Sequence, residues 1–119
     1  MVAAGLAAGA WSDHGHAKEA AGGPEVIEVV RFKLAAGVSP RDFLILDRLV
    51  EREHVAKQHG FLRRQSASTP DGEWLVIVHW ASAFDADASM ASFAKAPAAA
   101  AFMQGLDAST LTMQRFLRH

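Results

Sequence analysis

The segment from Glu73 to Ser82 constrains the fold of this chain more than any other, because it is apolar on both sides. Successive side chains of a β-strand point to opposite faces, so a sheet with one wet face alternates apolar and polar residues. One face of this segment carries Trp74, Val76, Val78 and Trp80. The other face carries Leu75, Ile77, His79 and Ala81. We therefore expect a strand that is covered on both faces.

Three more strands are predicted from composition and turn signals. Residues 25–34 and 109–117 are rich in the β-branched and aromatic residues that suit a pleated surface. Residues 61–68 lead into the segment 73–82 through Thr69-Pro70-Asp71-Gly72, whose residue types favour a hairpin turn.

Two helical regions lie between these strands. Ser39 can cap a helix that begins at Pro40 and ends at His59-Gly60, where Gly60 can adopt a left-handed conformation. A second helix is expected to begin near Phe84, with Ser82 or Asp85 as its cap. Pro97 interrupts this helix, and residues 98–104 resume it. The predicted order is strand, helix, strand, strand, helix, strand, which is the ferredoxin-like plan of an α+β protein.

The predicted sheet is antiparallel and four-stranded, with both helical regions on one face. Its first strand is also apolar on both sides, with Val26, Val30, Phe32 and Leu34 opposite Ile27 and Val29. Leaving one of these faces wet would forgo several kcal/mol of apolar burial at about 25 cal/mol per Å². We expect a second copy of the chain to cover the open face in a two-fold homodimer. The alternative is a monomer whose N-terminal tail or C-terminus folds over the sheet.

Residues 1–23 differ from the rest of the chain. They are rich in Ala and Gly without periodicity, and Gly22-Gly23-Pro24 marks a boundary. We interpret them as a disordered tail; the alternative is a residual export signal, although the basic start and long apolar core of such signals are missing. His14 and His16 are too few to form a metal site by themselves. We expect a cytoplasmic protein, with export to the periplasm as the alternative.

The composition excludes several classes of function. Twelve Lys and Arg against thirteen Asp and Glu give a net charge of -1, which argues against a nucleic-acid partner. The chain has no Cys, so thiol catalysis, disulfides and thiolate metal sites are excluded. No apolar run is long enough to span a bilayer, so we expect no membrane partner.

Several motifs resemble the dimeric α/β-barrel superfamily, in particular the antibiotic biosynthesis monooxygenase-like domains. The resemblance covers residues 25–118 and predicts one domain over residues 24–119. It rests on the following segments: Val26–Phe32, Ala36-Gly37-Val38-Ser39, Gly60–Arg64, Gly72–Trp80 with Ala86 and Ala88 after it, and Phe102-Met103.

This resemblance implies a homodimer with a pocket between the sheet and the helices. It implies a cofactor-independent oxygenase acting on a small flat apolar or aromatic molecule, without a metal. The alternative is a non-enzymatic homodimeric protein that binds a small molecule, or a stress-responsive α/β-barrel protein. Haem-degrading relatives use an Asn together with a Trp and a His, and this chain has no Asn.

Polar and aromatic residues on the predicted strands are the candidate site residues. His79 is a candidate acid or base near neutral pH, and Arg64 a candidate stabiliser of an enolate or phenolate. Glu28 could orient His79 from the neighbouring strand, or form a cross-strand pair with an Arg. The expected substrate-binding set is Glu28, Trp74, Trp80, Phe32, Phe93 and Phe102. Each of these side chains also has a purely structural interpretation, as a packed or hydrogen-bonded group of the core.

Overall fold

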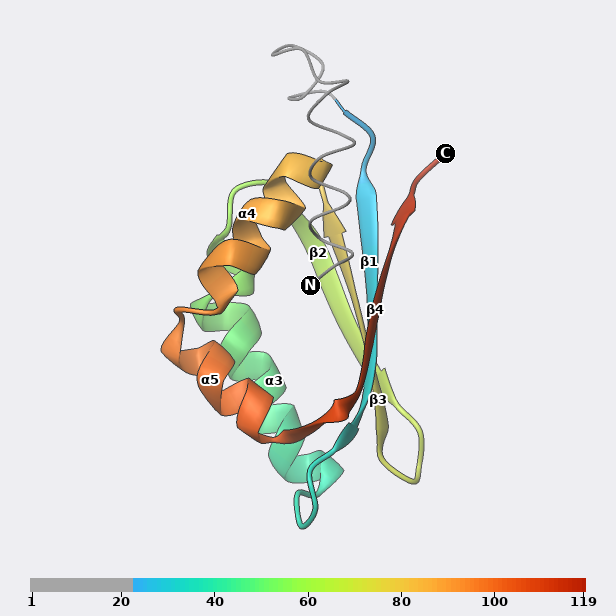
Figure 1. Ribbon diagram of the computed structural model, residues 1–119, viewed down its shortest axis with the longest axis vertical. Helices are drawn as coiled ribbons and strands as arrows, with labels where there is room; N and C mark the ends of the chain where they lie inside the picture. The colour runs from blue at the N-terminus through green and yellow to red at the C-terminus, as the bar shows by residue number, and fades with distance from the viewer. Residues whose placement is uncertain (1–22) are drawn as a thin grey trace.

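Four antiparallel strands form one sheet in the order β2–β3–β1–β4, and the helices lie on one of its faces (Figure 1). The structure is a computed structural model that describes residues 23–119. Its elements are β1 (Val26–Leu34), α3 (Pro40–Glu53), η1 (Val55–Lys57), β2 (Phe61–Ser68), β3 (Glu73–Trp80), α4 (Ala83–Phe93), α5 (Pro97–Gln104) and β4 (Leu106–Leu117). The predicted ferredoxin-like order and antiparallel sheet are confirmed.

The helix starts follow the predicted caps. The Ser39 hydroxyl accepts a hydrogen bond from the backbone N–H of Asp42 at 3.1 Å, and Pro40 occupies the first turn of α3. The Ser82 hydroxyl accepts a bond from the Asp85 N–H at 3.1 Å and begins α4. Each cap satisfies one backbone donor that the first helical turn leaves free.

The end of the first helix differs from the prediction. The sequence predicts a helix that continues to His59-Gly60, but α3 ends at Glu53 because His54 leaves the helical conformation, with φ -133° and ψ -64°. The His54 side chain instead reaches Ser92 at the end of α4, 2.8 Å away. The left-handed conformation predicted for Gly60 is present, with φ +81°.

The helix-facing side of the sheet holds the core. On β3 every second residue is buried, and these residues are Trp74, Val76, Val78 and Trp80. Phe43 of α3 packs against Trp74 with ring centroids 5.0 Å apart and against Phe32 of β1 at 5.5 Å, both edge to face. Such edge contacts contribute about 0.5–1.5 kcal/mol beyond the burial of area. They attach α3 to the centre of the sheet.

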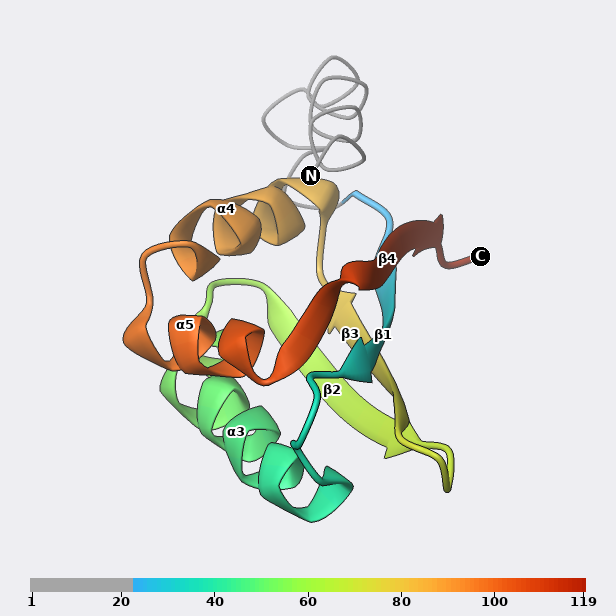
Figure 2. The same cartoon turned by 60° about the horizontal axis from the view of Figure 1, so that its bottom comes forward.

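None of the helices in residues 23–119 lies over the other face of the sheet (Figure 2). Side chains on this outer face alternate with the buried set, and its apolar members are Ile27, Val29, Leu75, Ile77 and Phe116. Phe116 is 45% exposed, and the other four are half-buried. The two-sided apolar pattern expected from the sequence is therefore real, and the described chain covers one side of it.

The predicted N-terminal tail or export signal falls almost entirely on residues outside the described range, as do His14 and His16. Among the helices that the structure describes, none has the length and apolar character needed to cross a membrane.

Candidate functional site

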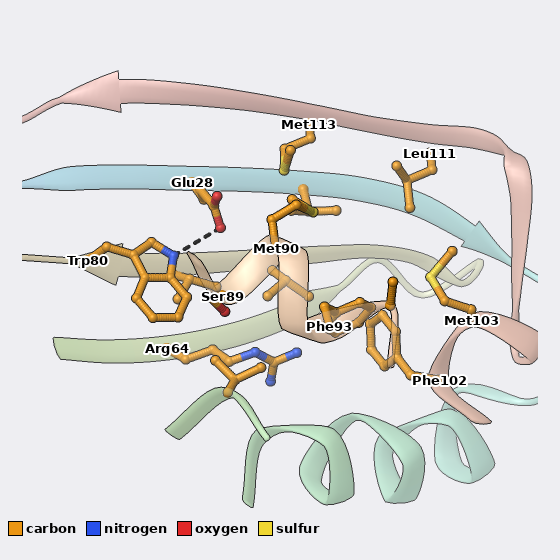
Figure 3. Close-up of a pocket in the computed structure, with 15 residues that line it drawn as sticks. Glu28, Arg64, Trp80, Ser89, Met90, Phe93, Phe102, Met103, Leu111 and Met113 are labelled. Carbon is orange, nitrogen blue, oxygen red and sulfur yellow. Dashed lines mark hydrogen bonds between the residues drawn. The ribbon is translucent and has the colours of Figure 1, made fainter. Parts of the chain in front are cut away.

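A cavity of about 320 Å³ lies between the helix-facing side of the sheet and the helices α4 and α5 (Figure 3). This volume is at the lower end of the range of ligand sites, which is about 300–1,000 Å³. Strands β1 to β4 supply one wall; Ser89, Met90 and Phe93 of α4 and Phe102 and Met103 of α5 supply the facing wall. Three lining residues are polar or charged: Glu28, Arg64 and Ser89. A small apolar molecule with few polar groups fits such a lining.

Five of the eight predicted site residues line this cavity. They are Glu28, Arg64, Trp80, Phe93 and Phe102. Phe32 and Trp74 lie in the adjacent core, where they pack against Phe43 and not against the cavity. His79 lies elsewhere, on the outer face of the sheet.

Glu28 is the carboxylate at the Trp80 end of the cavity. Its Oε1 accepts a hydrogen bond from the Trp80 indole N–H at 3.0 Å (Figure 3). Its Oε2 accepts one from Nε of Arg115 at 2.9 Å. The predicted cross-strand pair with an Arg is thus present, because β1 and β4 place Glu28 opposite Arg115. Burial raises the pKa of Glu28 above 4.5 even though Arg115 opposes that shift. A carboxylate with a raised pKa is a stronger base than one in water.

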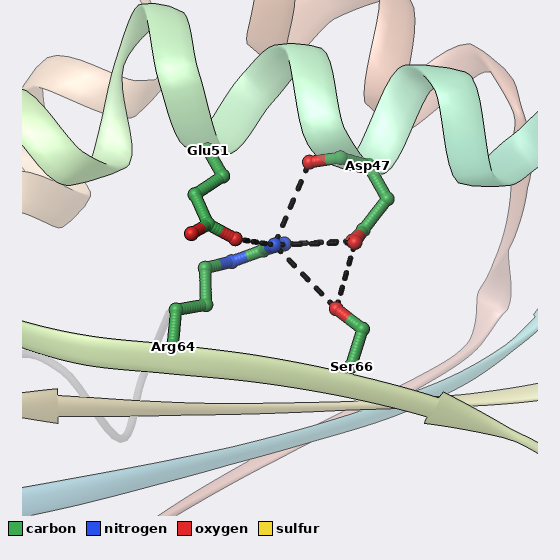
Figure 4. Close-up of polar contacts among 4 residues, drawn as sticks. All are labelled: Asp47, Glu51, Arg64 and Ser66. Atoms are coloured by element: carbon green, nitrogen blue, oxygen red, sulfur yellow. Dashed lines mark hydrogen bonds and ion pairs between the residues drawn. The ribbon is translucent and has the colours of Figure 1, made fainter.

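Arg64 lines the cavity from β2, and a cluster of acidic and hydroxyl groups holds its guanidinium between β2 and α3 (Figure 4). Its guanidinium donates to the Asp47 carboxylate at 2.8 and 3.2 Å and to Glu51 at 3.1 Å, and the Ser66 hydroxyl donates to Asp47 at 2.7 Å. The side chains of Arg64 and Asp47 are each 3% exposed. Arg64 therefore joins β2 to α3, and its positive charge is already paired with Asp47 and Glu51, which makes it a poor partner for an enolate.

His79 belongs to a separate cluster on the outer face. Its Nδ1 lies 2.7 Å from the Glu25 carboxylate, which also receives Arg63 at 3.1 Å and Arg118 at 3.4 Å. The hydrogen bond with His79 is the main cause that lowers the pKa of Glu25 below 4.5. The prediction that Glu28 could orient His79 is wrong, because the pairing Ile27↔His79 puts Glu28 and His79 on opposite faces of the sheet.

Sequence reasoning missed part of the lining and the partners of the charged groups. Met90 and Met113 line the cavity together with Met103, so three of the four methionines of the chain meet there. Flexible, polarisable methionines are common at adaptable binding surfaces, so the methionines in the sequence could have indicated these lining residues. Asp47 and Asp87 carried no such signal, because each looks like an ordinary polar residue of a helix.

No protein-family description matches this chain, and no curated protein matches it. Solved structures do match its fold. A variant of SnoaB, a cofactor-independent oxygenase from Streptomyces nogalater, has a TM-score of 0.67 at 21% identity over 81% of this chain and 94% of that one. PA3566 from Pseudomonas aeruginosa has a TM-score of 0.60 at 14% identity, over 88% of this chain and 99% of that one. A Chloroflexus aurantiacus protein is named provisionally as an antibiotic biosynthesis monooxygenase. It has a TM-score of 0.59 at 15% identity, over 80% of this chain and 93% of that one.

These likenesses establish the fold. The chain has the α+β ferredoxin-like fold that SnoaB and the Chloroflexus protein share, as the resemblance in its sequence motifs predicts.

Proposed function

We propose that this protein binds a small, flat, mostly apolar molecule in the cavity between sheet and helices and oxygenates it without a cofactor. The observation that carries the proposal is the buried carboxylate of Glu28 in a mostly apolar cavity. The fold adds support, since SnoaB is described as a cofactor-independent oxygenase. Molecular oxygen is itself apolar, which suits such a lining.

Glu28 is the proton acceptor in this proposal. A neutral substrate with an acidic CH₂ group beside an aromatic ketone gives one proton to the Glu28 carboxylate. The resulting carbanion adds to O₂ and, on reprotonation, forms a hydroperoxide, which loses water to leave a second ketone. The balance is CH₂ plus O₂ giving C=O plus H₂O, so no external reductant is needed.

The surroundings of Glu28 suit this proton transfer. The Trp80 N–H and the Arg115 guanidinium hold the two carboxylate oxygens in place at 3.0 and 2.9 Å. Burial raises the pKa of Glu28, which brings it nearer to that of a weakly acidic substrate. When the proton moves, the negative charge passes from Glu28 to the substrate, so the net charge inside the cavity does not change.

The test uses anthrone, a flat tricyclic ketone with an acidic CH₂ group, as the probe. We expect the protein to consume oxygen and form anthraquinone, and Glu28→Gln to slow this turnover about 100-fold or more while anthrone still binds. Glu73→Gln is the matched control, because Glu73 pairs with Arg31 on the outer face. Undiminished turnover by Glu28→Gln would refute the role of Glu28 as base.

A second candidate function is binding without chemistry. It is favoured by the fact that both oxygens of Glu28 already have partners within the protein. Tight binding of anthrone without oxygen consumption above the background rate would support this second function over the first.

We also propose that a second copy of the chain covers the outer face of the sheet. The exposed and half-buried side chains of Ile27, Val29, Leu75, Ile77 and Phe116 form the apolar surface that this contact would bury. We expect sedimentation equilibrium to give twice the chain mass of 12.8 kDa, and Ile77→Lys to give the single-chain mass. Ile45→Lys is the control, because Ile45 is an exposed residue of α3, 66% exposed. A wild-type protein of single-chain mass at micromolar concentration would refute the dimer.

A further inference from the structure

Arg64 lines the cavity, and Arg115 lies behind the lining residue Glu28; each of these arginines is paired with two carboxylates. Arg64 contacts Asp47 at 2.8 Å and Glu51 at 3.1 Å (Figure 4). Arg115 contacts Glu28 at 2.9 Å and Asp87 at 2.6 Å. These two clusters come from different strands and helices, yet both have one cation and two anions. Fully ionised, each carries a net negative charge.

These charged groups are largely buried, so water does not fully screen the charges of the two clusters. The side chains of Arg64 and Asp47 are 3% exposed, and those of Arg115 and Glu28 are 8% exposed. Asp87 is 21% and Glu51 39% exposed, so solvent screens their charges only in part. The buried cations are therefore neutralised by their closest partners, and the remaining charge near the cavity is negative.

The one cation among the lining residues, Arg64, is already paired with Asp47 and Glu51 and is not free to pair with an anionic ligand. Nη2 of Arg115 has no hydrogen-bond partner in the described part of the chain, but it is buried and presents almost no accessible surface. Apart from Glu28 and Arg64, the lining residues are apolar except for Ser89 with its hydroxyl. Moving an anion from water into such surroundings without a partner is strongly unfavourable. A neutral molecule does not incur this cost, and a cation gains from the nearby carboxylates.

We infer that the cavity selects neutral or cationic ligands and rejects anionic ligands of the same size and shape. This inference rests on the proposed binding of a flat apolar molecule between the sheet and the helices. It narrows the substrate class to molecules that enter uncharged or positively charged. It also agrees with a reaction in which the substrate becomes an anion only after its proton has passed to Glu28.

The test compares three naphthalene derivatives of one size: 2-naphthylmethanol, 2-naphthylmethylammonium and 2-naphthoate. Binding is measured by titration calorimetry near neutral pH. We expect the alcohol and the ammonium ion to bind and 2-naphthoate to bind at least about tenfold more weakly than the alcohol.

Two variants test whether the carboxylates of Asp87 and Glu28 cause the weaker binding of 2-naphthoate. Asp87→Asn leaves Arg115 with Glu28 as its single carboxylate partner, and Glu28→Gln leaves it with Asp87. We expect each variant to bring 2-naphthoate closer to the alcohol in affinity, and Glu73→Gln on the outer face to change nothing. Asp87→Asn keeps the test valid if Glu28→Gln does not fold, because Asp87 is the more exposed of the two.

The outcomes are distinct. Equal binding of naphthoate and alcohol to the wild-type protein overturns the charge selection while leaving the binding function intact. A discrimination that neither variant reduces overturns its assignment to these carboxylates. If none of the three compounds binds, the proposed binding function fails, and the charge selection fails with it.

Discussion

Replacing Arg64 by Met should leave the Asp47 carboxylate buried without its cation, and we expect this to be the most destabilising single change in the polar part of the core. Arg64 and Asp47 are each 3% exposed and share bonds of 2.8 and 3.2 Å, so water cannot take the place of the guanidinium without rearrangement. Removing one partner of a buried ion pair costs about 3–5 kcal/mol, which is a large part of the stability of an ordinary domain, about 5–15 kcal/mol.

The size of the effect can be read from urea unfolding. For a small domain the free energy of unfolding changes by about 1–3 kcal/mol per molar urea, so Arg64→Met should lower the unfolding midpoint by about 2 M. The control is Arg31→Met, which breaks an exposed pair with Glu73 whose side chains are 60% and 36% exposed. Exposed pairs contribute about 0–1 kcal/mol, and the control midpoint should barely move.

A double variant separates the loss of a pair from the creation of an unpaired charge. Arg64→Met combined with Asp47→Leu removes both charges, and it should recover most of the stability that Arg64→Met loses. The reasoning would be refuted if Arg64→Met unfolded at the same urea concentration as Arg31→Met, or if the double variant were less stable than Arg64→Met alone.

Three further predictions concern local structure and pH. Ser39→Ala should cost about 1 kcal/mol in urea unfolding through loss of the α3 cap; Ser82→Ala should cost more, because the buried Ser82 hydroxyl also donates to the Asp85 carboxylate, and equal losses would contradict this. Gly60→Ala should destabilise more than Gly72→Ala: both have positive φ, +81° and +96°, but a Cβ at Gly60 would collide with the Asp85 side chain whereas Gly72 faces open space. Burial lowers the pKa of His54 below 6.5, so the unfolded chain binds a proton at a higher pH than the folded one does. The stability of the protein should therefore fall as the pH drops below 6.5. Thermal unfolding followed across that range should show a weaker dependence of stability on pH in His54→Gln.

The sequence was sufficient for the elements and their order. The alternation in β3, the serine caps at Ser39 and Ser82 and the turn glycines act over a few residues, so the pattern along the chain determines them. The end of α3 was not predictable in this way, because it depends on a contact between His54 and Ser92, which are 38 residues apart in the chain.

The candidate site, too, could be predicted from the sequence only in part. The sequence indicated Glu28, Arg64, Trp80, Phe93 and Phe102 as candidates, and it predicted that Glu28 could pair with an Arg. It did not decide which face of the sheet His79 would occupy, since shifting a strand by one residue moves every side chain to the opposite face.

Local pattern thus determined that both faces of β3 are apolar, because alternation is a property of a single strand. Only the tertiary structure decided that Val78 and Trp80 face the helices while His79 and Ile77 face outward, through the pairings Glu28↔Val78 and Val26↔Trp80. Those pairings place the Glu28 carboxylate, and not the His79 imidazole, at the wall of the cavity. The physical reason is that register depends on the packing of the whole sheet against α3, α4 and α5, and a single strand does not contain that information.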